Sequence, residues 1–451
     1  MAQGYFLSGR HETPASFDYF FRSLPFEGGY VIFAGLSDLQ ALLEDFTFGV
    51  QEIEYLKKVG FRDEFLTYLK NFKFTGSLYS VKEGEVVFPG VPLIRVEGNI
   101  LECQILETLL LNIVNFESLI ATKASRMVQA AEGRSVLDFG LRRSQGLGGI
   151  QASKAAVIGG VRASSNVWAS HTYNLPVSGT MAHSWIQSFE SEYDAFKAYA
   201  EHYPDNTTLL VDTYNTLESG VPNAIRVAKE LEAKGHQLKA IRLDSGDLAY
   251  FARNSRKLLD EAGLEYVKIA VSNQLDEHLI KSLLDQGAPI DLFGVGTKLV
   301  TAHDDPALDG VYKLSSFGKK PTLKISENIE KITLPGIKKV LRAYNEDGSF
   351  YADVIGLEGE KDTDLIFHPY FSNKKTNLSG YYIKELLHCV IDEGKTLIEA
   401  SAPNEAARFA AEQLKRLQPE HKRFANPHVY KVGITGGLMS LRDELINQKN
   451  Q

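Results

Sequence analysis

The sequence predicts an α/β fold whose centre is a parallel sheet or barrel. From Ser135 onward, short apolar stretches alternate with helical patterns, and the later repeats recur at roughly 25–30 residues, which is typical of β-α units. The apolar stretches hold almost no polar residues, as expected for strands buried on both faces. The predicted strands are residues 135–140, 175–179, 207–212, 238–243, 266–271 and 290–295. The helices predicted between them include residues 195–203, 221–233, 248–262 and 276–286.

A doubly wound sheet would show the same alternation of strands and helices. Polar residues, however, gather at nearly every predicted strand's carboxyl end, where barrel enzymes build their active sites. This pattern favours a barrel and leaves the doubly wound sheet as the alternative.

The segment before the barrel predicts an α+β domain. Residues 17–33 are aromatic and then extended, and residues 53–72 have the apolar spacing of an amphipathic helix. Residues 77–96 place glycine and proline between valine-rich pieces, which suggests short antiparallel strands. Residues 101–131 are apolar nearly all round, which is typical of a buried helix or pair of helices.

After Thr301 the alternation stops. Residues 310–317 and 338–344 look extended, and Asn345-Glu346-Asp347-Gly348 is a hairpin signal leading into residues 350–355. Residues 404–417 form an amphipathic helical pattern. Because neither chain end alone can close a core, we expect the last segment to pack on the first. The expected domains are residues 1–120, 121–310 and 311–451.

The composition argues against several classes of protein. The 451 residues carry a net charge of -8 and have a pI of about 5.8, whereas a nucleic-acid partner would need a basic face. The two cysteines are far apart and have no metal-ligand spacing, which fits a reducing compartment. The start shows no signal peptide, and no apolar run approaches the roughly 18 residues of a membrane span. We therefore expect a cytoplasmic protein.

The carboxyl ends of the predicted strands carry the residues of a candidate site. Gly294-Val295-Gly296-Thr297 follows a late strand, where glycines let backbone amides approach an anion and barrels commonly bind phosphate. Arg142 and Arg242 offer planar guanidinium groups to phosphate or carboxylate. Asp212 and Asp244 offer carboxylates to Mg²⁺ or to ribose hydroxyls. Taken singly these are compatible with surface turns, but together they predict a site for a phosphorylated sugar with magnesium.

His183 is the residue around which these groups are arranged. It ends the run Ser178-Gly179-Thr180-Met181-Ala182, just before a helical pattern, so a rigid element holds it while it still faces solvent. A single histidine is compatible with capping or packing. Beside the strand-end residues, we expect it to act as base, acid or nucleophile.

Six short segments of the chain form a recognisable set. In the barrel region they are Phe-Gly-Leu-Arg-Arg at 139–143, Gly-Thr-Met-Ala-His-Ser at 179–184, Leu-Asp-Ser-Gly-Asp-Leu at 243–248 and Gly-Val-Gly-Thr at 294–297. Outside it they are Phe-Arg-Ser-Leu-Pro-Phe at 21–26 and Gly-Val-Tyr-Lys-Leu at 310–314. Together these segments resemble those of the nicotinate phosphoribosyltransferase family. The resemblance implies a homodimer that makes nicotinate mononucleotide and pyrophosphate from nicotinate and phosphoribosyl pyrophosphate, coupled to ATP hydrolysis with Mg²⁺. It also implies an irregular, incomplete TIM-like barrel beside an α+β domain built from both chain ends.

The resemblance further implies roles for single residues. His183 is similar to the histidine that ATP phosphorylates, and Thr180 and Arg242 match positions that contact nicotinate. Phe139 matches the aromatic residue that stacks on the pyridine ring. The other residues predicted to bind substrate are Ser165, Asp212, Ser245, Gly246, Gly296 and Thr297, and the residues predicted to be catalytic are His183, Arg142 and Asp244.

One departure from the family concerns the chain start. Family members usually have a Thr-Asp-Leu-Tyr stretch before the point where this chain has Met1 to Tyr5, and its tyrosine stacks on nicotinate in the neighbouring subunit. That tyrosine is missing here. Either the start is set too late, or Tyr5, Tyr19 or Phe20 takes its place.

Two alternatives compete with this interpretation. Nicotinamide phosphoribosyltransferase carries an aspartate in the stretch that aligns with Ala163-Ser164-Ser165-Asn166, where this chain has no carboxylate to repel nicotinate. The second alternative is a protein with the same fold that binds phosphate or a partner but is catalytically silent. Intact His183, Arg142 and Asp244 favour the enzyme.

Overall fold

The chain forms two compact units. The computed structural model describes residues 1–328, 331–371 and 373–450. Unit 1 combines both chain ends, Met1–Leu119 and Ala307–Gln451, and unit 2 is the continuous segment Ile120–Pro306. The boundaries expected from the sequence were 120 and 310.

Unit 2 is built on a sheet of six parallel strands in the order β7-β6-β11-β10-β9-β8. Its strands are β6 (Ser135–Asp138), β7 (Ala163–Ser164), β8 (Thr208–Leu210), β9 (Ala240–Leu243), β10 (Lys268–Ser272) and β11 (Leu292–Val295). The two end strands, β7 and β8, do not pair with each other, so the sheet is a curved, unclosed part of a barrel. This confirms the predicted incomplete α/β barrel.

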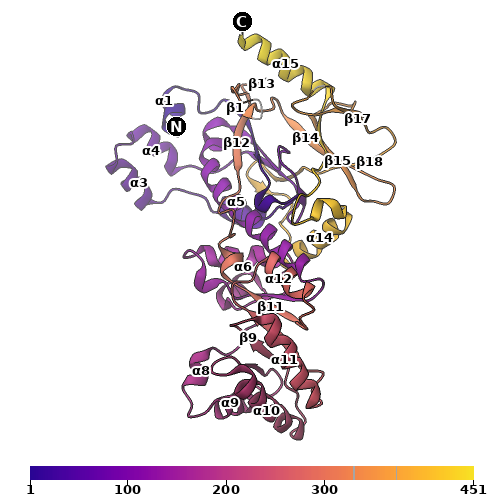
Figure 1. Cartoon of the computed structure of the whole chain (residues 1–451). Coiled ribbons are helices and arrows are strands. Elements are labelled where there is room, and N and C mark those ends of the chain that lie inside the picture. The colour runs from indigo at the N-terminus through magenta and orange to yellow at the C-terminus, as the bar shows by residue number, and fades with distance from the viewer. Residues whose placement is uncertain (329–330, 372, 451) are drawn as a thin grey trace. The chain divides into compact units, whose positions relative to one another are not determined.

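Helices connect the strands of unit 2 (Figure 1). They are α6 (Gly148–Ile158), α7 (Val167–Tyr173), α8 (His183–Gln187), α9 (Glu192–His202), α10 (Val221–Ala233), α11 (Leu248–Glu261), α12 (Glu277–Asp285) and α13 (Thr297–Val300). Several begin at a side-chain cap: the carboxylates of Asp247 and Asp276 accept the backbone N–H groups of Tyr250 and Leu279 at 3.0 and 2.7 Å. The predicted helices between the later strands are confirmed.

The predicted strand at residues 175–179 is wrong. Only an isolated bridge between Val177 and Ser164 occurs there. Pro176 has no amide hydrogen to donate to a ladder, and Val177 is 60% exposed, so the segment runs beside β7 without joining the sheet. The two-residue strand β7 is too short to have shown a pattern in the sequence.

Unit 1 contains two larger sheets and one short one, in the orders β13-β12-β1-β5-β3-β19-β20, β17-β16-β21-β15-β14-β18 and β2-β4. Strands from the start of the chain are β1 (Pro14–Phe21), β2 (Val31–Ile32), β3 (Ser77–Ser80), β4 (Val86–Val87) and β5 (Ile94–Asn99). Strands from the end are β12 (Gly310–Phe317), β13 (Lys320–Pro321), β14 (Lys338–Tyr344), β15 (Phe350–Leu357), β16 (Leu365–Phe367), β17 (Lys375–Asn377), β18 (Tyr382–Glu385), β19 (His388–Asp392), β20 (Lys395–Thr396) and β21 (Val432–Thr435). Because β1 pairs with β12 and β3 with β19, the two ends share one sheet.

A buried ion cluster also joins the two ends within unit 1. The fully buried guanidinium of Arg342 donates two hydrogen bonds to Asp353, at 2.7 and 2.9 Å, and one to Glu85 at 2.6 Å. The two carboxylates hold the pKa of Arg342 above its usual value against the opposing effect of burial. Asp353 follows the hairpin predicted at 345–348, whereas Glu85 comes from the N-terminal segment.

The helices of unit 1 are α1 (Ala2–Leu7), α2 (Leu36–Glu44), α3 (Val50–Lys58), α4 (Asp63–Lys70), α14 (Pro403–Arg416) and α15 (Gly436–Asn450). The single helix predicted over 53–72 is therefore wrong. Gly60, with φ of +97°, ends α3 and separates it from α4.

Helix α5 (Ile100–Ala130) runs across the boundary between the units. It is long and apolar enough to cross a membrane by length and composition, contrary to the expectation that no segment would be. Its side chains Lys123 and Arg126 are buried, however, and both pair with Glu277. Buried ion pairs of this kind mark the helix as part of a protein core.

Candidate active site

Arg242 on β9 joins three segments at the carboxyl ends of the strands in unit 2. Its guanidinium donates to the Thr180 hydroxyl at 2.7 Å, to Ser272 Oγ at 2.9 Å and to Asp244 Oδ1 at 2.9 Å. Only 14% of its side chain is exposed. Charge-assisted hydrogen bonds in this shielded setting fix the guanidinium plane.

Ser272 follows a predicted strand but was not among the predicted site residues, because its Ser-Asn pair fitted an ordinary turn equally well. Its hydroxyl accepts from Arg242 and donates to Asp244 Oδ1. The next two residues, Asn273 and Gln274, have φ of +93° and +50°, which is strained for residues other than glycine and is common at functional sites. The Ser-Asn pair at a strand end was the available signal, but such pairs also form ordinary turns.

His183 is the first residue of α8 and is partly exposed. Its Nδ1 lies 3.0 Å from Thr213 Oγ1, and its Nε2 lies 3.9 Å from Asp244 Oδ2. The second distance is too long for a hydrogen bond but close enough for a carboxylate to stabilise positive charge on the ring. Thr213, which the sequence also did not single out, orients the ring.

Asp212 supports the loop after β9 and keeps one oxygen free. Its Oδ2 accepts the backbone N–H of Asp244 and the hydroxyl of Ser245, both at 2.7 Å. Its Oδ1 is buried and has no hydrogen-bond donor among the described residues. A buried carboxylate oxygen without a donor fits a ribose hydroxyl or a Mg²⁺ ion.

The described residues contain no group of three or more His, Cys, Asp or Glu side chains that could hold a metal by themselves. Magnesium commonly binds through one or two carboxylates together with substrate phosphates. Asp212 therefore fits a Mg²⁺ that arrives with a phosphorylated substrate, not one held in a protein cage.

Phe139 presents its ring beside Arg242 because Gly294 leaves room for it. A Cβ atom added at Gly294 would lie 2.5 Å from the Phe139 ring. The guanidinium carbon of Arg242 lies 5.4 Å from the ring centroid. An aromatic face and a cation so placed suit a planar anion.

The turn predicted to bind phosphate follows the neighbouring strand, β11. The Phe139 backbone N–H donates to the Val295 carbonyl at 2.7 Å, so Gly296 and Thr297 follow immediately beside the Phe139 segment. Gly296 lies before Thr297, the first residue of α13. Across the site, Gly246 has φ of +72°, which turns the loop after Asp244.

Two of the predicted site residues, Arg142 and Ser165, have no side-chain hydrogen bond to the residues around Arg242 and His183 in the described part of the chain. Arg142 lies on the short 3-10 helix Leu141–Arg143, is exposed, and contacts no described residue by hydrogen bond or ion pair. Ser165 is exposed too, and its backbone N–H donates to the Asp138 carbonyl at 2.9 Å. Both follow strand ends of the same sheet, but the structure does not bring either side chain onto His183.

Tyr19 cannot be the second stacking aromatic. It is fully buried in unit 1, and its hydroxyl donates to Asn115 at 2.8 Å. Burial also raises the pKa of Tyr19. Tyr5 on α1 and Phe20 on β1 are partly exposed. That one of them takes the place of the missing family tyrosine stays a prediction.

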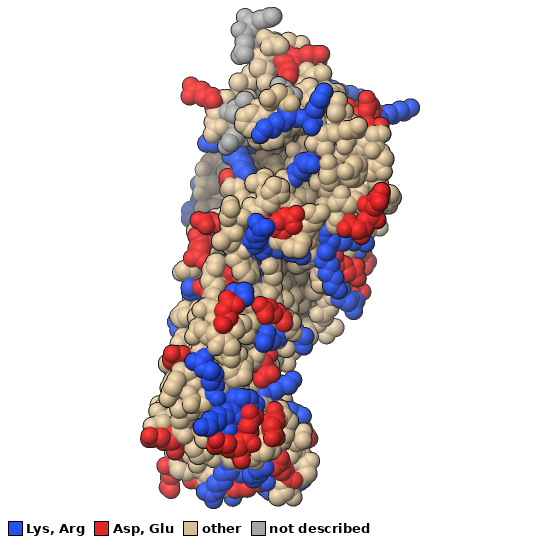
Figure 2. All heavy atoms as spheres, turned by 45° about the vertical axis from the view of Figure 1, so that its right-hand side comes forward, with Lys and Arg blue, Asp and Glu red and all other residues tan. Residues whose placement is uncertain are grey.

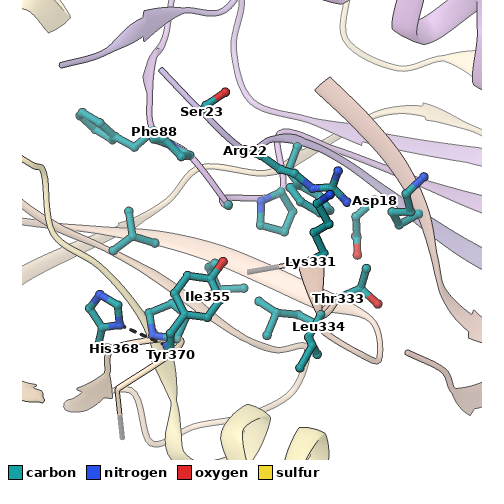
Figure 3. Close-up of a pocket in the computed structure, with 18 of the residues that line it drawn as sticks. Asp18, Arg22, Ser23, Phe88, Lys331, Thr333, Leu334, Ile355, His368 and Tyr370 are labelled. Carbon is teal, nitrogen blue, oxygen red and sulfur yellow. Dashed lines mark hydrogen bonds between the residues drawn. The ribbon is translucent and has the colours of Figure 1, made fainter. Parts of the chain in front are cut away.

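Unit 1 contains a separate cavity of about 740 Å³, a size typical of small-molecule sites. Arg22 and Lys331 lie toward one end of it and His368 and Tyr370 toward the other (Figure 3). The Nε of Arg22 is buried without a hydrogen-bond acceptor among the described residues. The lining draws on two segments that carry the family resemblance, 21–26 and 310–314, and its cations and apolar walls suit an anionic ligand.

Basic and acidic side chains are interspersed over the face of the molecule shown in Figure 2. A nucleic-acid-binding surface would instead concentrate lysine and arginine in a patch or stripe. This distribution agrees with the negative net charge of the chain.

Comparisons with known proteins assign the chain to a family. Residues 1–115 match the nicotinate phosphoribosyltransferase N-terminal domain, residues 135–350 the nicotinate phosphoribosyltransferase family, and residues 337–442 its C-terminal domain. The nicotinate phosphoribosyltransferase of Bacillus subtilis is 44% identical over 99% of this chain and 93% of its own length. The chain belongs to the nicotinate phosphoribosyltransferase family.

Other nicotinate phosphoribosyltransferases agree with this assignment. That of Dictyostelium discoideum is 36% identical over 96% of this chain and 84% of its own. The crystal structure of human nicotinic acid phosphoribosyltransferase matches with a TM-score of 0.89 and 31% identity, covering 99% of this chain and 98% of that one. The chain is thus an enzyme of the phosphoribosyltransferase type that belongs to NAD biosynthesis.

Proposed function

We propose that the chain transfers the phosphoribosyl group of phosphoribosyl pyrophosphate to the ring nitrogen of nicotinate, and that ATP hydrolysis drives the reaction through phosphorylation of His183. The pyridine nitrogen forms a bond to the sugar carbon as the bond to pyrophosphate breaks. The observation that carries this proposal is the Arg242 cluster, which places a cation and a hydroxyl beside an aromatic face.

In this proposal the nicotinate ring lies on Phe139, and its carboxylate accepts from Arg242 and Thr180. The guanidinium plane is already fixed by Ser272 and Asp244, so little order has to be imposed when the acid binds. The amide of nicotinamide carries no charge to pair with Arg242. The site therefore favours the acid.

The sugar and its leaving group would be held by the loops after β8, β9 and β11. Asp212 and Ser245, which lie side by side, would bind the ribose hydroxyls, and the backbone around Gly296 and Thr297 would bind a phosphate. Positive charge develops on the sugar carbon as pyrophosphate departs, and Asp244 can stabilise it. A bound Mg²⁺ would neutralise negative charge on the pyrophosphate.

His183 would receive the γ-phosphoryl group of ATP. The bond between this phosphorus and ADP breaks as a phosphorus–nitrogen bond to the imidazole forms, and water later releases phosphate. The half-exposed ring beside Thr213 is accessible to a nucleotide. A phosphorylated His183 would add an anion that arginine side chains near the site can bind.

The test measures pyrophosphate release from phosphoribosyl pyrophosphate with nicotinate or nicotinamide, each with and without ATP. We expect ATP-stimulated release with nicotinate and a specificity constant for nicotinate more than about tenfold above that for nicotinamide. Equal specificity constants would point to the nicotinamide enzyme. No release with either ring would point to a silent relative.

We also propose that the active form is a homodimer in the cytoplasm. The family resemblance motivates this proposal, and the exposed apolar side chains of unit 2 support it.

A further inference from the structure

Asp138 is a buried carboxylate directly behind the candidate site. It is the last residue of β6, and its exposed fraction is 0%. Its Oδ1 accepts the backbone N–H of Gly140 at 2.8 Å. Its Oδ2 accepts the hydroxyls of Ser153 and Ser164 at 2.8 and 2.7 Å. Three donors aimed at one buried carboxylate make a rigid polar centre.

The network extends from Asp138 to the segment after β7. Ser164 Oγ accepts the backbone N–H of Asn166 at 3.0 Å, and Asn166 donates to Ser153 Oγ at 3.2 Å while its Oδ1 caps α7. Ser153, Ser164 and Asn166 are also fully buried. Between two of these anchored residues lies Ser165, whose own N–H is held by the Asp138 carbonyl.

On its other side, Asp138 controls the backbone that carries Phe139. The hydrogen bond to Gly140 and the bond from the Phe139 N–H to Val295 hold both peptide groups that flank the aromatic residue. The Phe139 ring also touches Gly294 closely. Asp138 therefore links the aromatic face on one loop to Ser165 on the next.

We propose that Asp138 is a positioning residue for the pyridine substrate: its carboxylate fixes Phe139 and Ser165 relative to each other and so sets the affinity for the ring. This inference rests on the proposed function. Asp138 touches no reacting atom in this proposal, because it is fully buried and both of its carboxylate oxygens accept from protein donors. Its effect should appear in ring binding and not in the binding of the phosphorylated sugar.

The experiment is a double-mutant cycle between Asp138→Asn and Phe139→Ala. The amide has one acceptor atom where the carboxylate has two, so it cannot satisfy all three donors as before. We expect Asp138→Asn, and Ser164→Ala, to raise the KM for nicotinate about tenfold while the KM for phosphoribosyl pyrophosphate changes less than about twofold. In the Phe139→Ala background, Asp138→Asn should change the KM for nicotinate less than about twofold, because both act through one ring.

Ser255→Ala is the matched control. Ser255 is a fully buried serine of unit 2 whose hydroxyl has no hydrogen-bond partner among the described residues. The Ser255→Ala substitution should leave the KM values for nicotinate and for phosphoribosyl pyrophosphate unchanged. Two results would overturn the inference. One is a tenfold rise in the KM for nicotinate on Asp138→Asn both with and without Phe139. The other is an equal rise in the KM values for nicotinate and for phosphoribosyl pyrophosphate.

Hydrogen exchange separates this inference from the proposed function. Without any substrate, amide exchange in a peptide that covers residues 139–143 should be faster in Asp138→Asn and Ser164→Ala than in Ser255→Ala. Unchanged exchange overturns the positioning role even if the enzyme uses nicotinate. Faster exchange in a chain that does not turn over nicotinate leaves the network standing and overturns the proposed function alone.

Discussion

His183 can be tested at the level of a single side chain. If the ring only exchanges a proton, His183→Ala should slow turnover about 10²–10⁴-fold with or without ATP. We expect a selective loss instead: no ATP hydrolysis and no ATP stimulation, with slow ATP-independent transfer retained because Arg242 and Asp244 still hold the substrates. Label from the γ-phosphate of ATP should appear on the parent protein as an acid-labile, base-stable adduct.

His236→Ala provides the control for this measurement. His236 also lies in unit 2, where its Nδ1 contacts Asp205 at 2.8 Å, and it precedes β9, whereas the site residue Asp244 follows that strand. The His236→Ala variant should take up as much label from the γ-phosphate of ATP as the parent protein does. ATP hydrolysis in step with product formation by His183→Ala would show that the histidine does not carry the phosphoryl group.

Gly294 is a second residue whose substitution gives a sharp result. In Gly294→Ala the new methyl group would lie 2.5 Å from the Phe139 ring, so the ring must move. We expect the KM for nicotinate to rise about tenfold, since a displaced ring loses its contact with the pyridine. Steady-state kinetics with varied nicotinate measures this. An unchanged KM would mean that Phe139 does not stack on the substrate.

At this scale, the sequence located residues whose chemistry stands out at a strand end. Arg242 and Asp244 are charged residues at the end of β9, and the structure joins them by a hydrogen bond. Thr180, which the family resemblance indicated, accepts from the same guanidinium. Ser272 and Thr213 were missed because serine and threonine at strand ends look the same whether they cap a turn or complete a site. Their roles depend on which strands are neighbours, and spacing along the chain does not reveal this.

At the scale of elements, α5 and α12 are held together by a buried ion cluster. Lys123 and Arg126 on α5 both pair with Glu277, at 2.9 and 2.8 Å, and all three are buried. Glu277→Gln should lower the free energy of unfolding by about 3 kcal/mol, because it removes the carboxylate that both buried cations share, while Lys123 keeps its pair with Asp304 at 3.3 Å. Urea denaturation measures this loss. Glu261→Gln, which breaks an exposed pair with Lys257, should cost less than about 0.5 kcal/mol.

The same cluster predicts a dependence of stability on pH. Burial alone would raise the pKa of Glu277, but Lys123 and Arg126 hold it below its usual value. A carboxyl whose folded pKa is depressed stabilises the fold above its unfolded pKa of about 4.3 and stops doing so as the pH falls through the folded pKa. The free energy of unfolding should therefore decrease as the pH is lowered beneath about 4. The decrease should be less steep in Glu277→Gln, which lacks this carboxyl group. Parallel profiles would contradict this assignment.

The sequence predicted elements well where the pattern was long. Residues 221–233 and 310–317 form the helix and strand expected of them, because ten or so residues establish a period. The two-residue strand β7 has no period, and the apolar run at 175–179 looked like a strand although Pro176 prevents regular pairing. The single helix expected over residues 53–72 was wrong because Gly60 divides the amphipathic pattern into two helices.

For the molecule as a whole, exposed apolar side chains in unit 2 bear on assembly. Leu147, Val167, Trp168, Val177 and Tyr214 are each at least 60% exposed. They belong to the segments that follow β6, β7 and β8, as do the site residues Phe139 and Asp212. Large apolar side chains that are this exposed favour a subunit interface in this part of unit 2.

We therefore expect a homodimer, and Trp168→Asp should weaken it. Placing a carboxylate in an apolar interface disfavours association by several kcal/mol. Light scattering at assay concentration should show a dimer for the parent and a larger monomer fraction for the variant, with activity reduced in parallel. A fully active parent monomer would contradict the prediction.

The pairing of the two chain ends has a consequence during synthesis on the ribosome. Strand β1 ends at Phe21, but its partner β12 begins only at Gly310, after the whole of unit 2. At about 5–20 residues per second, roughly 15–60 s pass before that partner is made. Unit 2 can fold as it emerges. The N-terminal strands can pair as β1-β5-β3, but the outer edges of β1 and β3 stay unpaired until β12 and β19 are made, and such edges invite association with other chains. A chain released just after unit 2 would carry a folded incomplete barrel and an N-terminal sheet that lacks its partner strands β12 and β19.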